Sequence, residues 1–199
     1  MQACIAGFDD GFFERGWRRT IAVLAVHCWR GSSLCPCGAY TAMLTIDGLD
    51  ATARAAELVA RAMERHRLQA VLLDTNIYAG FNILDPEALH RETSVPVIVV
   101  YWYPPNRDAV RRALELHFPD WRTRLKLLEK VWSKLSKMPC PKGELLLASY
   151  GMETGEAWSL TCSLQLHTRQ PEPLFTAHKL ASMLSRQLAS LLKGHGKQS

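Results

Sequence analysis

The sequence predicts an α/β protein on a mixed sheet of three antiparallel strands followed by two parallel strands. Three apolar segments rich in β-branched residues follow one another at the N-terminus, and such a series is typical of an antiparallel meander. Strand-like and helix-like periods then alternate, which indicates parallel strands with helices on both faces. The expected strands are residues 3–9, 20–29, 39–47, 69–74 and 95–101.

Each of these elements has a local reason. The first strand is an apolar run that the turn signal Asp9, Asp10, Gly11 closes. A helix over residues 49–67 follows from its amphipathic spacing, with Asp50 as the expected N-cap. Asp85 precedes a proline and so predicts the start of the next helix. The strand over residues 95–101 is continuously apolar, as expected for a parallel strand that is covered on both faces.

The C-terminal half is expected to consist mainly of helices. Periodicity predicts helices over residues 106–118, 120–137 and 173–193, a hairpin formed by residues 144–150 and 157–167, and a frayed tail over residues 194–199. The length of 199 residues favours one domain that spans residues 1–199.

Composition excludes several classes of protein. Hydrophobic residues make up 48% and charged residues 22% of the chain, so a disordered or fibrous protein is excluded. No apolar run has the length of a membrane span, and the N-terminus does not resemble a signal peptide, so we expect a soluble, cytoplasmic protein. The net charge of +5 allows a polyanionic partner but does not require one.

The six cysteines are too few for a disulfide scaffold, and reduced thiols are the simplest expectation. Cys35 and Cys37, with Cys28 upstream, allow a zinc site, a local disulfide or ordinary buried thiols. A closed zinc site needs four ligands, and these cysteines supply three.

Aspartates close three separate apolar strands. Asp9, Asp47 and Asp74 each end a segment that is expected to lie in the sheet, so their carboxylates are expected to converge. Converging carboxylates repel one another, and a hard cation such as Mg²⁺ or Mn²⁺ offsets that repulsion. The alternative interpretation is that each aspartate is a turn or cap residue, because Asp-Gly after a strand is also a turn signal.

Positive charge recurs every fourth residue along the helix expected over residues 120–137. The stripe consists of Arg122, Lys126, Lys130 and Lys134. It is either a solvated helix face or a surface that follows a phosphate backbone. Gly80 and Asn82 lie shortly after Asp74, where they either contact a nucleic acid or form a structural turn.

Several motifs resemble those of an uncharacterised, mainly archaeal protein family that is distantly similar to endonuclease V. They are IAGFDDG, IDGLDAT, LLDTNIYAGFNILD followed by VPVIVVY, and PEPLFTAHKLA, and they span the chain from Ala6 to about Leu184. The resemblance implies a ribonuclease H-like fold with a C-terminal helix. It also implies that Asp9, Asp47 and Asp74 hold the metal and that His178, in PEPLFTAH, helps to coordinate metal or water.

The sequence also departs from endonuclease V. Trp102 is the nearest residue to the position at which those enzymes carry a lysine, and their strand-separating wedge is not visible before Asp47. Specificity for inosine is therefore not implied.

Two functions follow from these patterns. The first is a nuclease or phosphodiesterase that depends on Mg²⁺ or Mn²⁺ and acts on DNA or RNA, with Asp9, Asp47, Asp74 and His178 as its catalytic residues. The alternative is a catalytically inactive module on the same fold that binds nucleic acid or takes part in assembly. In either case a protein partner or a homodimer is a further expectation.

Overall fold

The three apolar N-terminal segments form the antiparallel meander that the sequence predicts. In the computed structural model, which describes residues 3–195, these strands are β1 (Ala3–Asp10), β2 (Arg19–Arg30) and β3 (Ser33–Thr45). β4 (Arg67–Asp74) pairs parallel to β1, and β7 (Val97–Tyr101) pairs parallel to β4. The mixed sheet of three antiparallel and two parallel strands is therefore confirmed.

Two further strands complete a seven-stranded sheet. β9 (Leu145–Tyr150) pairs antiparallel to β7, and β8 (Ser136–Met138) pairs antiparallel to β9. The order across the sheet is β3-β2-β1-β4-β7-β9-β8. Because β1 and β4 are parallel neighbours, the aspartates at their carboxyl ends lie at the same edge of the sheet.

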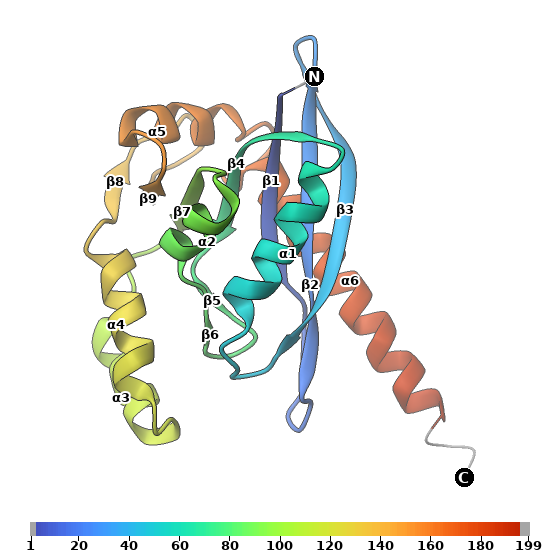
Figure 1. Ribbon diagram of the computed structural model, residues 1–199, viewed down its shortest axis with the longest axis vertical. Coiled ribbons are helices and arrows are strands. Elements are labelled where there is room, and N and C mark those ends of the chain that lie inside the picture. Colours follow the sequence, from blue (N-terminus) through green and yellow to red (C-terminus); the bar gives the residue numbers. More distant parts are fainter. Residues whose placement is uncertain (1–2, 196–199) are drawn as a thin grey trace.

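Helices cover both faces of this sheet (Figure 1). α1 and α2 pack on one face, and α6 crosses β1 and β2 on the other. The helices are α1 (Ala51–Met63), α2 (Pro86–Thr93), α3 (Arg107–His117), α4 (Trp121–Trp132), α5 (Thr154–Ser163) and α6 (Glu172–His195), and a two-stranded ribbon is formed by β5 (Ile77–Tyr78) and β6 (Asn82–Ile83).

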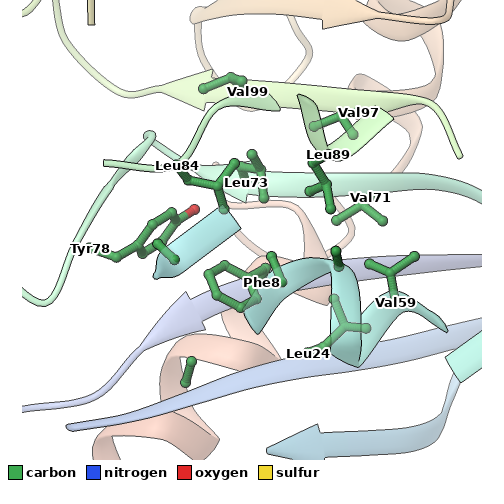
Figure 2. Close-up of a cluster of buried hydrophobic side chains, with 14 of the residues drawn as sticks. Phe8, Leu24, Val59, Val71, Leu73, Tyr78, Leu84, Leu89, Val97 and Val99 are labelled. Atoms are coloured by element: carbon green, nitrogen blue, oxygen red, sulfur yellow. The ribbon is translucent and has the colours of Figure 1, made fainter. Parts of the chain in front are cut away.

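The central strands are buried on both faces. Val71 and Leu73 of β4 belong to the core below α1 and α2, whereas Ala70 and Leu72 belong to the core on the other face. Figure 2 shows the first of these cores, in which Phe8 lies beside Tyr78 with ring centroids 4.9 Å apart. Burial on both faces explains the continuously apolar pattern of these strands.

The expected hairpin of residues 144–150 and 157–167 is wrong in its second half. Alternating apolar residues from Trp158 to Leu166 suggested a strand, but the segment begins with α5. In α5 and at its C-cap, the side chains of Ala157, Thr161 and Leu164 are buried. They are three to four residues apart, which is the spacing of one helix face. Trp158 stays partly exposed and donates its indole N–H to the Pro139 carbonyl oxygen at 2.7 Å.

Two other expectations need correction at the ends of helices. The helix expected over residues 120–137 ends at Trp132, and Ser136 begins β8 instead. The last helix reaches His195, so residues 194 and 195 of the expected frayed tail are helical, and residues 196–199 lie outside the described residues. Among the helices of residues 3–195, none combines the length and the apolar character that crossing a membrane requires.

Candidate active site

An acidic cleft lies at the carboxyl ends of β1 and β4. Asp9 and Asp10 end β1, Asp74 ends β4, and all three line a cleft of about 510 Å³ together with His178 of α6. Four groups that transfer protons or bind cations therefore meet in one cavity, although His178 is more than 100 residues from the aspartates in sequence.

Glycines in β1 and directly after it bring His178 to this cleft. In a strand, alternate residues share a face, and Gly7, Asp9 and Gly11 all point toward α6. A Cβ atom at Gly7 would lie 2.3 Å from the Pro173 carbonyl carbon, and one at Gly11 would lie 2.6 Å from the Ala181 carbonyl oxygen. Because both positions lack a side chain, α6 packs directly on β1. His178 Nδ1 then lies 2.9 Å from Asp9 Oδ2.

The three carboxyl groups affect one another. Burial, followed by repulsion from the Asp9 carboxylate, raises the pKa of Asp10 to about 7. The same two causes, in the same order, raise the pKa of Asp74 to about 7. The contact with Asp9 raises the pKa of His178, because the carboxylate stabilises the protonated imidazole. The cleft thus concentrates negative charge that a cation would stabilise.

Asp10 shares the cleft with Asp9, although adjacent residues of a strand normally point to opposite faces. Both fit because Asp10 is the last residue of β1. Asp10 Oδ2 accepts a hydrogen bond from the Ala79 amide at 2.7 Å, while Asp9 faces α6.

Trp102 orients the carboxylate of Asp74. Its indole N–H donates to Asp74 Oδ1 at 2.7 Å, and this hydrogen bond favours the charged form of the carboxyl group. Trp102 comes directly after β7, the strand next to β4. The residue nearest to the expected lysine position therefore supplies a neutral donor instead of a cation.

Asp47 occupies a different place at this edge of the sheet. It follows β3, two strands away from β1, and it does not line the cleft. Asp47 Oδ1 accepts a hydrogen bond from the Phe81 amide at 2.9 Å, and the Asp47 amide donates to the Ala79 carbonyl oxygen at 2.8 Å. In the structure Asp47 thus holds the loop of residues 79–81, which Asp10 also contacts.

Gly80 and Asn82 both make contacts within the fold. Gly80 has a φ of 82°, and a Cβ atom there would lie 2.2 Å from Asp47 Oδ1. Asn82 is fully buried. Its amide nitrogen donates to the Thr45 carbonyl oxygen and to Asp50, and its oxygen accepts from the Ala51 amide. Asn82 therefore satisfies the first backbone amide of α1 with a buried side chain.

Asp50 does not act as the expected N-cap through its side chain. It occupies the N-cap position of α1, but its carboxylate accepts hydrogen bonds from the Thr45 amide and hydroxyl. At α2 the expectation is confirmed, because Asp85 accepts from the amides of Glu87 and Ala88.

The basic stripe is only partly available for a phosphate backbone. Lys130 forms ion pairs with Asp85 and Glu87 of the α2 N-terminus. Lys134 lies beyond the end of α4, with its ammonium group 4.4 Å from the centroid of the Tyr150 ring. Arg122 and Lys126 are exposed on α4. None of the four lines the cleft.

Arg124 is a buried cation that the charge pattern did not single out. It is 5% exposed, and its guanidinium pairs with Asp120 and donates to the carbonyl oxygens of Gly48 and Phe81. It ties α4 to the loops that follow β3 and precede β6. The signal that could have found it is its position between apolar residues of α4, on the buried side of the helix.

A second hollow of about 490 Å³ continues the cleft along the sheet edge. It shares Asp74, Trp102 and His178 with the acidic cleft and extends to Tyr103 and Arg169. Tyr103 is 73% exposed, and the Arg169 guanidinium carbon lies 5.3 Å from its ring centroid. Aromatic and cationic groups therefore adjoin the acidic groups.

Together, the mixed sheet with helices on both faces and the acidic cleft at the ends of β1 and β4 define a ribonuclease H-like α/β protein. The crystal structure of human endonuclease V matches with a TM-score of 0.55 and 18% identity, covering 94% of this chain and 84% of that one. A protein of unknown function from Archaeoglobus fulgidus matches with a TM-score of 0.76 and 24% identity over 92% of this chain and 98% of its own. At these identities the two structures establish the fold.

The chain belongs to the endonuclease dU family, whose sequence pattern matches residues 2–185. A UPF0215 protein of Pyrococcus furiosus is 32% identical over 182 residues, which are 92% of either protein. A UPF0215 protein of Aeropyrum pernix is 33% identical over 184 residues, or 92% of this chain and 98% of its own. The resemblance to an archaeal family related to endonuclease V is thus confirmed, and it supports a nuclease-type function.

Proposed function

We propose that the protein is a divalent-metal-dependent nuclease that hydrolyses phosphodiester bonds at the acidic cleft. The observation that carries this proposal is the meeting of Asp9, Asp10, Asp74 and His178 in one cavity. A structural role for three mutually repelling carboxyl groups would be costly, because Asp10 and Asp74 are mostly buried and carry raised pKa values.

The donor set suits Mg²⁺ or Mn²⁺. Both are hard cations that prefer carboxylate oxygens, and Mg²⁺ usually binds one or two carboxylates and completes its shell with water and phosphate oxygens. Asp9 and Asp74 would hold the ion, with Asp10 beside them, and the ion would polarise the phosphate and favour attack by water.

His178 is placed to hold or move a proton at its imidazole. Nδ1 faces Asp9, which fixes the orientation of the ring, and about half of the side chain is exposed to the cleft. Such a histidine can orient an attacking water or protonate a leaving oxygen. Trp102 keeps Asp74 in one orientation through its indole N–H.

We propose that Asp47 supports the metal site, as the resemblance implies. Its observed contacts are with the loop of residues 79–81, so we expect it to position that loop and Asp10 when substrate binds. Replacing Asp47 should therefore reduce cleavage less than replacing Asp74.

The substrate proposed is nucleic acid, and the family description suggests DNA that contains deoxyuridine. The hollow with Tyr103 and Arg169 offers a ring on which a base can stack and a cation nearby. Arg122 and Lys126 of α4 would add contacts to phosphates outside the cleft.

Cleavage assays on matched substrates test this proposal. The purified protein is incubated with duplexes that differ only in one deoxyuridine, one inosine or one thymidine, and with the equivalent single strands and RNA, in Mg²⁺ or Mn²⁺. We expect scission that requires the cation and is lost in Asp74→Asn and in His178→Gln. Glu57→Gln, a surface carboxylate on α1, is the matched control. Equal cleavage by wild type and Asp74→Asn would rule out the proposed site.

A binding module without catalysis is the second candidate. The observations that favour it are Trp102 at the position nearest to the expected lysine and Asp47 outside the cleft. It predicts binding to nucleic acid that weakens as salt rises, without scission of any of these substrates.

A further inference from the structure

A second cluster of ligand-type side chains lies near the opposite end of β1. Cys4, Cys28, Cys37 and His66 each direct one ligand atom to a common point, and these four atoms all lie within 4.8 Å of one another. Cys4 and Cys28 are buried, and Cys37 and His66 are half-buried. Cys4 is five residues from Asp9 along β1, a distance of roughly 16 Å at 3.3 Å per residue, so the cluster is separate from the acidic cleft.

The sheet brings the three cysteines to one face. Cys4 and Cys28 are directly paired residues of β1 and β2, with Cα atoms 4.0 Å apart. Cys37 lies at an irregularity of β3, where Val26 pairs with Gly38 and His27 pairs with Pro36. Cys37 is thus the extra residue of a β-bulge, and bulges redirect side chains. Its sulfur lies beside Cys28 although Cys35, two residues earlier, remains outside the cluster.

His66 completes the cluster from the segment between α1 and β4. Its Nδ1 lies 3.8 Å from Cys28 Sγ and 3.9 Å from Cys37 Sγ. The ring packs edge-on against Tyr40, and its other nitrogen, Nε2, would lie 3.0 Å from a Cβ atom at Gly38. The absence of a side chain at Gly38 therefore leaves room for the imidazole, and its neighbours aim Nδ1 at the sulfurs.

Disulfide bonds do not account for this arrangement. Cys28 is paired with both Cys4 and Cys37, but a sulfur atom makes only one disulfide bond. In either pairing, the third cysteine and His66 would lie against a disulfide bond in which they take no part. A single tetrahedral cation uses all four groups at once, and a Cys₃His set is one of the common ligand sets of structural zinc.

We propose that Cys4, Cys28, Cys37 and His66 bind one structural Zn²⁺. Four protein ligands leave no open position for water or substrate, so this ion stabilises the fold and does not take part in the cleavage reaction. It joins β1, β2, β3 and the segment after α1 near the end of the sheet that is remote from Asp9. The zinc site that the sequence suggested from Cys28, Cys35 and Cys37 thus has different ligands, with Cys4 and His66 in place of Cys35.

Metal analysis of the wild-type protein is the primary test, because it needs no variant that has to fold. The full chain is purified with a thiol reductant and without chelator, and its zinc, iron and copper contents are measured. We expect about one zinc per chain. After removal of zinc, Co²⁺ should restore the folded protein with the thiolate-to-cobalt absorption bands of a tetrahedral site.

Matched variants assign the ligands. Cys37→Ser and His66→Ala should lose the bound zinc and lower the melting temperature, whereas Cys35→Ser, two residues from Cys37, should keep both unchanged. His66→Cys should retain zinc, because it exchanges one ligand type for another. Asp74→Asn should also retain it, which separates this site from the acidic cleft.

The proposal is overturned if the reduced wild-type protein contains no zinc and does not bind added Zn²⁺ or Co²⁺. It is equally overturned if mass spectrometry of the protein purified without reductant finds a stable Cys4–Cys28 or Cys28–Cys37 disulfide that accounts for its stability. Iron or copper in place of zinc would also contradict it.

Discussion

The two ends of β1 carry opposite kinds of chemistry. At the carboxyl end Asp9 and Asp10 face an open cleft, and the neighbouring groups are another carboxylate and a half-exposed imidazole. Near the amino end Cys4 lies among sulfur atoms and an imidazole nitrogen within 4.8 Å, mostly shielded from water. Hard oxygen donors in an open cleft suit an exchangeable cation, whereas soft donors that are mostly buried suit a permanent one.

Under the two proposals, one end of the strand supports the reaction and the other end supports stability. The acidic end is destabilising without a cation, since burial and repulsion raise the pKa of Asp10 and Asp74. At the cysteine end we expect the bound ion to stabilise the sheet. Substitutions at the two ends should therefore affect stability with opposite signs, and the predictions below test this contrast, beginning with the largest effect.

Replacing Asp9 with Asn should have the largest effect, which is a loss of activity. Asp9 both faces the cleft and orients His178, so we expect cleavage to fall by more than the ~10–100-fold that is typical of residues one step removed from a metal. Single-turnover cleavage rates measure this loss. Cys37→Ser at the other end should keep its cleavage rate at temperatures where it remains folded. A similar loss in both variants would mean that the two ends are not separate.

Replacing Gly7 with Ala should displace α6 from β1. The new Cβ atom would meet backbone atoms of Pro173 and Leu174, which cannot move without shifting the helix that carries His178. We expect the free energy of unfolding to fall by about 1–3 kcal/mol and the cleavage rate to fall with it. Denaturant unfolding and kinetic assays measure both quantities. Gly155→Ala in α5 is the control, because nothing lies within 4 Å of a Cβ atom there.

Replacing Asp10 with Asn should stabilise the protein above neutral pH in buffer without added divalent cations. Its pKa of about 7 in the folded protein exceeds the usual 3.8, so the folded state loses stability as pH rises between these values. Asparagine removes this loss, and we expect a gain of roughly 1–3 kcal/mol at pH 8, since each pKa unit corresponds to ~1.4 kcal/mol. The gain should vanish near pH 4. Unfolding curves across this pH range measure it, and a loss of stability at pH 8 would contradict the proposed repulsion.

Replacing Trp102 with Phe should have the smallest effect. The substitution keeps an aromatic ring but removes the indole N–H that donates to Asp74, so the pKa of Asp74 should rise further. We expect a decrease in cleavage of about threefold to tenfold at neutral pH, in line with the ~0.5–1.5 kcal/mol of one typical hydrogen bond. The decrease should shrink at higher pH, where Asp74 is charged in both proteins. A pH–rate profile of the two proteins separates this effect from a general loss of folding.

Much of the fold could be predicted because its signals are local. The continuous apolar pattern of residues 95–101 identified β7, and Asp85 with Pro86 identified the start of α2. The helix α5 was missed because alternating apolar residues imitate a strand when the buried side is not known. The end of α4 was missed because β8 gains its hydrogen bonds from β9, a contact that the local sequence does not contain.

The two candidate sites differ in how much the sequence disclosed. Asp9, Asp74 and His178 were found from strand ends and from the resemblance, and the structure places them in one cleft. Asp10 and Trp102 were missed because their roles depend on where β1 ends and on which strand lies beside β4. At the other end, Cys28 and Cys37 were noted, but Cys4 and His66 were not connected with them.

The sequence by itself determined most of the order of strands and helices and the residue types able to bind cations, because hydrophobic period and side-chain chemistry are properties of the chain alone. Only the tertiary structure decided which of those residues meet. Strand pairing places Asp74 beside β1 and Cys28 opposite Cys4, and the β-bulge turns Cys37 toward them. The absence of a side chain at Gly7 lets α6, which carries His178, pack directly on β1. These are contacts between segments far apart in sequence, and they are fixed by backbone hydrogen bonding and close packing.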